Sequence, residues 1–71
     1  MTKLEAGQVW IGTIKYRLGT KSTRREIVKT AHGRRELLIH FVSKAGLHCC
    51  YEREFRAWIE RTNATLQETK P

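Results

Sequence analysis

The sequence contains no long hydrophobic run. Its apolar stretches, such as Val9-Trp10-Ile11 and Leu37-Leu38-Ile39, fall far short of the roughly 20 residues that a membrane-spanning helix needs. The first ten residues also lack the apolar segment of a secretory signal peptide. We therefore expect no transmembrane helix, no membrane partner and a cytoplasmic protein.

Cysteine is scarce, since Cys49 and Cys50 are the only two and they are adjacent. Neighbouring residues on a strand point to opposite faces, so this pair cannot link distant parts of the chain and is expected to stay reduced. His48 adds a third potential metal ligand, but three consecutive residues cannot converge on one ion, and no second ligand pair follows at zinc-like spacing. The sequence predicts no disulfide, no metal site and no cofactor.

Signatures of catalysis are missing as well. The chain has no nucleophile in a recognisable elbow, no glycine-rich phosphate loop after a strand and no carboxylate pair that stands out. A chain of 71 residues buries only about 60% of the surface that its unfolded form exposes, so it has no room for a second core or a large cleft. We expect residues 1–71 to form one domain that is not an enzyme.

Alternating apolar residues predict strands along the first two thirds of the chain. The expected strands cover residues 8–18, 25–31, 36–42 and 47–51. The first is expected to bend or bulge near Gly12. Residues 19–23 contain no apolar side chain and predict a long exposed loop. His32-Gly33-Arg34 predicts a tight hairpin turn in which Gly33 adopts a positive φ.

From Glu52 the apolar period changes from two to about 3.6 residues. Phe55 and Trp58 lie on one side of the resulting pattern and charged residues on the other, which predicts an amphipathic helix over residues 52–63. Asn63 is the expected C-terminal cap, and residues 67–71 are expected to form a flexible tail. The fold class is therefore mostly β, either a small curved antiparallel sheet or an SH3-like barrel, capped by a C-terminal amphipathic helix. Both tryptophans, at positions 10 and 58, are expected in its core, and the alternative for Trp10 is a platform on which a base or a partner side chain stacks.

Three features occur in a recognisable order: an entry strand GQVW at residues 7–10, the His-Gly-Arg hairpin, and a short strand that runs into the helix YEREFRAWIE. This order resembles the small SH3-like barrel modules found among phage and plasmid accessory proteins, and the resemblance covers most of residues 7–66. As a class, SH3-like barrels imply binding of nucleic acid, of a peptide or of another protein.

The positive charge is concentrated in one part of the chain. Residues 15–35 contain eight Lys or Arg and one Glu, a net charge of +7, whereas the rest contains six bases and six acids that sum to zero. Such a concentration attracts phosphates and acidic surfaces, and arginine binds both in a bidentate manner. The alternative is a basic loop that only keeps an edge strand from pairing with other molecules.

Nine residues form the predicted binding site for nucleic acid or an acidic partner: Lys15, Tyr16, Arg17, Lys21, Arg24, Arg25, Lys29, Arg34 and Arg35. Tyr16 is included because an aromatic ring between two cations suits stacking on a base, although a partly buried edge tyrosine is an equal alternative. The first hypothesis is a small basic protein that contacts the backbone of DNA or RNA. The second is a phage-type regulatory or inhibitory module that docks on an acidic surface of a host protein or nucleoprotein complex. A homodimer through a strand edge is a further expectation.

Overall fold

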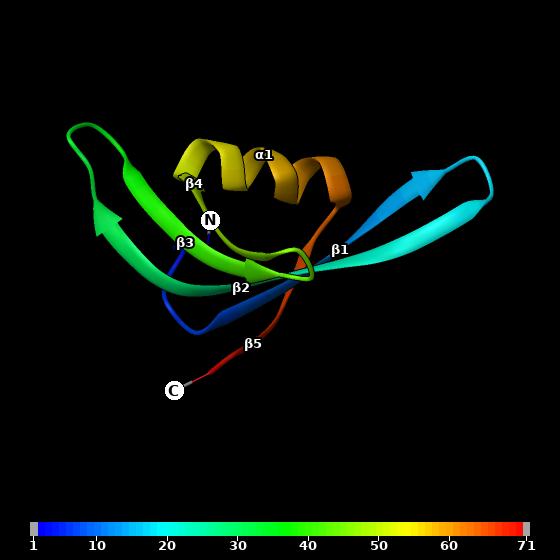
Figure 1. Cartoon of the computed structure of the whole chain (residues 1–71), viewed down its shortest axis with the longest axis horizontal. Helices are drawn as coiled ribbons and strands as arrows, with labels where there is room; N and C mark the ends of the chain where they lie inside the picture. Colours follow the sequence, from blue (N-terminus) through cyan, green and yellow to red (C-terminus); the bar gives the residue numbers. More distant parts are fainter. Residues whose placement is uncertain (1, 71) are drawn as a thin grey trace.

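The computed structural model describes residues 2–70 as one curved sheet with a single helix on its concave side (Figure 1). The elements are β1 (Gln8–Tyr16), β2 (Gly19–His32), β3 (Leu37–Ser43), β4 (Gly46–Tyr51), α1 (Glu52–Thr62) and β5 (Thr65–Thr69). Neighbouring strands are antiparallel in the order β4-β3-β2-β1-β5. The fold is therefore mostly β with one amphipathic helix, as predicted. Over the described residues, this helix is too short and too polar to span a membrane.

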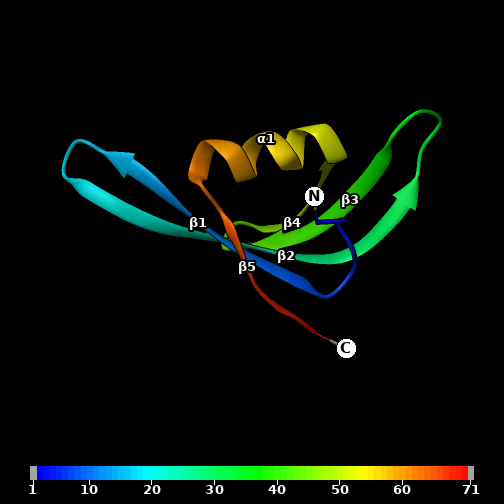
Figure 2. The same cartoon turned by 180° about the vertical axis from the view of Figure 1, so that it is seen from behind.

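The sheet is open, because β4 and β5 are its two edges and do not pair with each other in the described part of the chain. Of the two expected architectures, the curved antiparallel sheet is observed and the closed barrel is not. The helix is also not the last element, since β5 follows it and returns to pair with β1 (Figure 2). The register of that pairing shifts between Val9 and Trp10, so the irregularity predicted near Gly12 lies earlier in β1.

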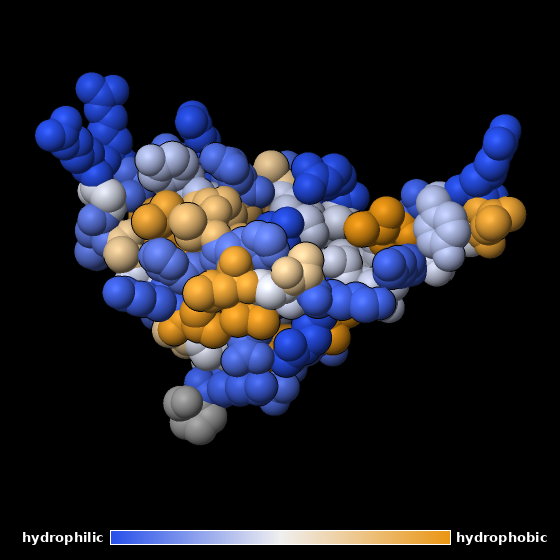
Figure 3. Space-filling view, in the orientation of Figure 1, coloured by the Kyte–Doolittle hydropathy of each residue, from blue (hydrophilic) through white to orange (hydrophobic). Residues whose placement is uncertain are grey.

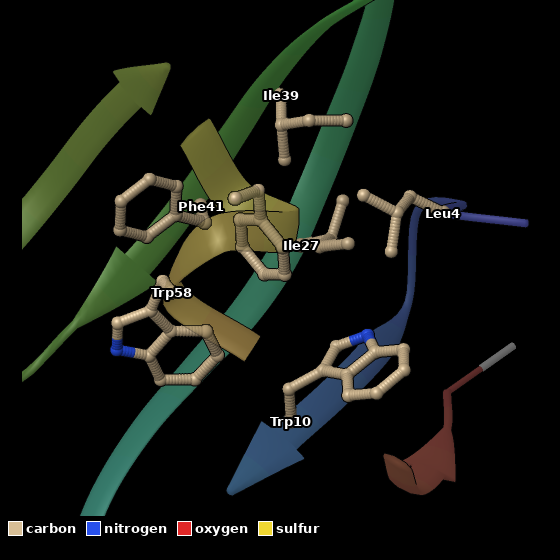
Figure 4. Close-up of a cluster of buried hydrophobic side chains, with 7 residues drawn as sticks. Leu4, Trp10, Ile27, Ile39, Phe41 and Trp58 are labelled. Carbon is tan, nitrogen blue, oxygen red and sulfur yellow. The ribbon is translucent and has the colours of Figure 1, made fainter. Parts of the chain in front are cut away.

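The core fills the space between α1 and the concave face of the sheet (Figure 4). Its buried side chains are Leu4, Trp10, Ile27, Ile39, Phe41, Phe55 and Trp58. Both tryptophans are buried, as predicted, with 7% of Trp10 and 3% of Trp58 exposed. The indole nitrogen of Trp10 donates a hydrogen bond of 3.1 Å to the side-chain oxygen of Gln8. Its polar atom is thus satisfied, as burial of an indole requires.

Gly12 determines how closely the end of α1 approaches the sheet. A Cβ atom at this position would collide with the side chain of Thr62, the last residue of the helix. The Thr62 hydroxyl is itself fixed, because it donates a hydrogen bond of 2.8 Å to the carbonyl of Trp58. Asn63 then ends the helix in the left-handed conformation, with φ of 52°, which confirms its predicted role as the C-terminal cap.

The prediction of a loop at residues 19–23 was wrong, because these residues begin β2. β1 and β2 pair without interruption from Val9–Glu26 to Tyr16–Gly19, and only Arg17 and Leu18 form the turn between them. The absence of apolar residues misled the prediction, since a strand that is exposed on both faces needs none. We call residues 13–22 the arm; all ten are exposed.

Two smaller predictions also fail. Gly33 does not have a positive φ. The hairpin connection spans residues 33–36 instead, and a 2.9 Å hydrogen bond from the Gly33 amide to the Glu36 carbonyl closes it.

The expected flexible tail is ordered by pairing with β1. Residues 65–69 form β5, and the Lys70 amide donates a 2.7 Å hydrogen bond to the Gly7 carbonyl. Pro71, the last residue of that expected tail, lies outside the described residues.

Candidate functional site

The arm projects from the core at one end of the molecule, on the right in Figure 1. It carries three cations, Lys15, Arg17 and Lys21, and no acid. Large apolar side chains are exposed beside them: 45% of Ile14, 54% of Tyr16 and 90% of Leu18. No residue from 2 to 70 buries this combination of positive charge and apolar surface, so it is available to a partner.

The two faces of the arm differ. Ile14 pairs with Lys21 and Tyr16 with Gly19, and by strand alternation these residues share the face of Trp10, which is the side of α1. Lys15 pairs with Thr20 and faces the other way. Cations therefore flank the apolar side chains from both faces of the arm.

A groove of about 660 Å³ lies between the arm and the C-terminal end of α1. It is lined by Thr13, Ile14, Lys15, Trp58, Arg61, Thr62 and Asn63. Arg61 therefore lies close to the cations of the arm. Counting charges along the sequence did not predict this position, because the acids and bases around Arg61 sum to zero. Only the packing of the helix end on β1 brings Arg61 to the same groove as Lys15.

The second cationic region lies at the opposite end of the molecule, in the turn between β2 and β3. Arg34 and Arg35 are exposed there and line a shallow hollow of about 400 Å³ together with Lys3 and His32. Two acids also line this hollow. Glu36 forms an ion pair of 3.5 Å with Arg53, and Glu52 forms an ion pair of 2.7 Å with Arg56. The positive charge of Arg34 and Arg35 is therefore not neutralised by these carboxylates.

Arg25 has a different position, inside the concave face. Its guanidinium carbon lies 4.4 Å from the ring centres of both Phe41 and Trp58 and 5.6 Å from that of Phe55. These distances are within the range of cation–π attraction. Burial lowers the pKa of Arg25. Arg25 was predicted as a binding residue, and the structure places it against the aromatic core.

Arg24 and Lys29 lie on the convex face, away from α1. Arg24 forms an ion pair of 3.1 Å with Glu26, which also binds the Lys70 ammonium at 3.1 Å. Hydrogen bonds from Lys70 and then Arg24 lower the pKa of the Glu26 carboxyl. Lys29 is opposite His40 in the β2–β3 register, on the face that does not carry the core. Arg24 is on the same face as Lys15, but neither Arg24 nor Lys29 belongs to the arm or to the β2–β3 turn.

The nine predicted residues therefore do not form one cluster. Lys15, Tyr16, Arg17 and Lys21 lie together in the arm, and Arg34 and Arg35 lie at the far end of the molecule, whose extents are 41 × 26 × 26 Å. β2 separates the two groups because it is a continuous strand of 14 residues. Both ends nevertheless curve toward the side of α1 (Figures 1 and 2), and hydrophilic side chains stand out at both upper corners of the molecule (Figure 3).

The convex face carries a separate apolar surface on β3 and β4. Val42 pairs with Leu47 and Leu38 with Tyr51, and of these side chains 68% of Leu47, 43% of Tyr51 and 37% of Val42 are exposed. β4 is an edge of the sheet. The thiol of Cys49 is on the same face, opposite His40, whereas Cys50 is opposite the buried Ile39. Among the described residues no group of three or more His, Cys, Asp or Glu is placed to hold a metal ion.

Comparison with protein-family models, with curated proteins and with solved structures finds no match to this chain. The resemblance to SH3-like modules therefore stays a prediction.

Proposed function

We propose that this protein binds duplex DNA through the phosphate backbone, with the arm and the β2–β3 turn on the same face of the duplex. The observation that carries the proposal is the position of these two cationic ends. They lie at opposite ends of an axis of 41 Å and curve toward the same side of the molecule (Figure 1). One turn of B-form DNA is about 34–36 Å long, so phosphates one turn apart face the same way at this spacing.

The charges between the two ends favour contact at the ends themselves. The exposed side of α1 contributes three arginines and three glutamates from residues 52–62, and two of these arginines form ion pairs with Glu36 and Glu52. In the described part of the chain, no ion pair engages Lys15, Arg17, Lys21, Arg34 or Arg35. These five side chains are free to replace the counterions of five phosphates.

The shape of the arm favours DNA over double-stranded RNA. Two-stranded ribbons of DNA-binding proteins enter the major or the minor groove of B-form DNA. The major groove of A-form RNA is deep and too narrow for protein side chains to read. An arm that projects as a paired ribbon is therefore better suited to the DNA duplex.

Binding of fluorescently labelled duplexes, measured by anisotropy over a range of salt concentrations, tests the proposal. For a duplex of about 16 base pairs, five phosphate contacts predict that log K falls with log salt at a slope of about −4 to −5. A duplex of eight base pairs is too short to reach both ends and is expected to give a slope of only −2 to −3, roughly half. No binding at low salt, or affinity that does not change with salt, would contradict the proposal.

A second candidate is docking on an acidic protein surface, which includes the phage-type regulatory or inhibitory role. The observation that favours it is the exposed apolar surface of Val42, Leu47 and Tyr51, because apolar side chains supply the strong contacts of protein interfaces while charges steer association. Pull-down from lysate with and without nuclease separates the two candidates. A partner that stays bound after nuclease treatment and is lost in Leu47→Ser supports protein docking.

The same surface supports the proposal of a homodimer. β4 is an edge strand of six residues whose unpaired backbone groups are available to a second copy. Two copies joined at β4 would extend the sheet and place their apolar convex faces next to each other. Sedimentation of the wild-type chain and of Leu47→Lys tests this proposal. We expect the wild type to be a dimer and the variant to be a monomer. A wild type that stays monomeric at all concentrations would contradict the homodimer.

A further inference from the structure

Leu18 occupies the outermost position of the arm. It is 90% exposed and shares the turn with Arg17 alone. Turn positions of this kind usually carry Gly, Asn, Asp or Ser, each of which satisfies a local backbone requirement. A leucine offers none of these advantages, and nothing in the described part of the chain covers this one. Its presence is therefore explained by neither the turn nor the core.

Leu18 is also not an isolated apolar residue on the surface. Ile14 and Tyr16 are exposed on the adjoining part of the arm, and Lys15, Arg17 and Lys21 surround them. Single exposed leucines are common and need no explanation. An apolar tip set among cations, at the end of a projecting ribbon, combines attraction to phosphates with a side chain that avoids water.

We infer that Leu18 is a wedge that inserts between neighbouring base pairs of the DNA duplex from the minor groove. This inference rests on the proposed function. Proteins that enter the minor groove use Arg and Lys against its walls and insert Leu, Ile, Phe or Met into a base step, which they partly unstack. The arm supplies both components, with Lys15 and Arg17 beside the groove phosphates and Leu18 at the step.

The construction of the arm suits this role. Unstacking a base step costs a few kcal/mol, so the wedge must be held firmly while it is inserted. β1 and β2 pair at every position from Thr13–Ser22 to Tyr16–Gly19, and the base of the arm is fixed where Gly12 meets Thr62 of the helix. The aromatic ring of Tyr16, 54% exposed, provides a surface on which an unstacked base can rest.

The experiment uses duplexes that contain 2-aminopurine, whose fluorescence rises when the base is unstacked. One duplex places it beside a single TA step, which is among the most easily opened steps, and a second places it in a stiff A-tract. We expect the full-length protein to raise the fluorescence of the first duplex and to bind it several-fold more tightly than the second. Leu18→Ser, which suits the turn, is expected to lose both the fluorescence rise and the preference while it keeps the salt slope. Leu18→Met, which stays apolar, is expected to keep both.

The outcomes separate this inference from the proposed function. Wild-type binding without a fluorescence change, or a rise that Leu18→Ser leaves intact, overturns the wedge while DNA binding stands. Absence of binding to either duplex by anisotropy overturns both. Thermal unfolding of Leu18→Ser serves as the control, and its midpoint is expected to equal that of the wild type because 90% of Leu18 is exposed.

Discussion

The arm is the continuation of β1 and β2 beyond the core, yet charged and apolar side chains have opposite environments in the core and in the arm. In the core, Trp10 is buried and Arg25 packs against aromatic rings. In the arm, Tyr16 and Leu18 are exposed and the cations have no ion-pair partners among the described residues. The boundary between the two regions lies at Gly12, where the helix ends.

Helix length explains the difference. α1 has 11 residues, which at 1.5 Å per residue cover roughly 16 Å, whereas the 14 residues of β2 span roughly 45 Å at 3.3 Å each. A helix this short covers only the middle of β2. The first part of β2 is left without a covering layer and carries Lys21, and the turn that follows its other end carries the exposed Arg34 and Arg35. Burial of a side chain in this fold therefore depends on its distance from α1 more than on its type.

Trp58→Ala tests the core side of the comparison and has the largest expected effect. Trp58 packs against Phe55, with ring centres 5.4 Å apart, and against Arg25. Its removal is expected to cost about 3–5 kcal/mol of unfolding free energy, enough to unfold much of a small domain. Urea denaturation followed by circular dichroism measures the loss. Tyr16→Ala is the matched control in the arm, and a similar loss there would show that the arm is part of the core.

Gly12→Ala tests the boundary itself. The added methyl group would meet the Thr62 side chain, and such overpacking is expected to cost about 1–3 kcal/mol. Thr13→Ala, at the neighbouring exposed position, is expected to change the unfolding free energy little. Equal stability of Gly12→Ala and the wild type in urea would mean that the helix end does not depend on this close approach.

Arg25→Met tests whether a cation of the core differs from a cation of the arm. Loss of the attraction to Phe41 and Trp58 is expected to cost about 1 kcal/mol, while DNA affinity changes little. Arg17→Met is expected to do the reverse, with unchanged stability and weaker binding. Urea unfolding measures the stability of both variants, and anisotropy measures their DNA affinity. A large loss of affinity in Arg25→Met would show that Arg25 takes part in binding.

Much of the fold was predictable from the sequence because alternation and helical periodicity follow burial. The strand around Ile39 and Phe41 and the helix around Phe55 and Trp58 were predicted for this reason. The β1 half of the arm was predicted as a strand from the alternation of Ile14 and Tyr16. Residues 19–22 of β2 and the residues of β5 were not predicted as strands, because their exposed side chains give no alternating apolar pattern and their order comes from backbone pairing.

The candidate site was predictable only as a set of residue types. Counting charge found the cations, but their distribution depends on the geometry of β2. Its length separates Arg34 from Lys21, and strand alternation sends Arg25 inward and Arg24 outward. The groove position of Arg61 depends on a tertiary contact between β1 and α1. No local pattern in the sequence encodes these distances.

Glu26→Gln has the smallest expected effect. Lys70 and Arg24 lower the pKa of this carboxyl below its ordinary value of 4.5. Folding therefore favours the ionised form of Glu26. Its contribution to the free energy of unfolding is fully present above pH 4.5 and is lost as the pH falls through the lower pKa of the folded state. The substitution is expected to weaken slightly the acid dependence of unfolding, as measured by urea titrations between pH 3 and pH 7. An identical pH profile in wild type and variant would exclude a role for this pair in stability.

The most direct test of the proposed function is the salt dependence of DNA affinity in three matched double variants. Arg17→Gln with Lys21→Gln removes two cations from the arm, and Arg34→Gln with Arg35→Gln removes two from the far end. Each pair is predicted to reduce the slope of log K against log salt by about 1.8. The control, Arg24→Gln with Lys29→Gln, removes two cations from the convex face and is predicted to leave the slope unchanged. Equal slopes in all three variants, or a change confined to the convex-face control, would contradict binding through the two ends.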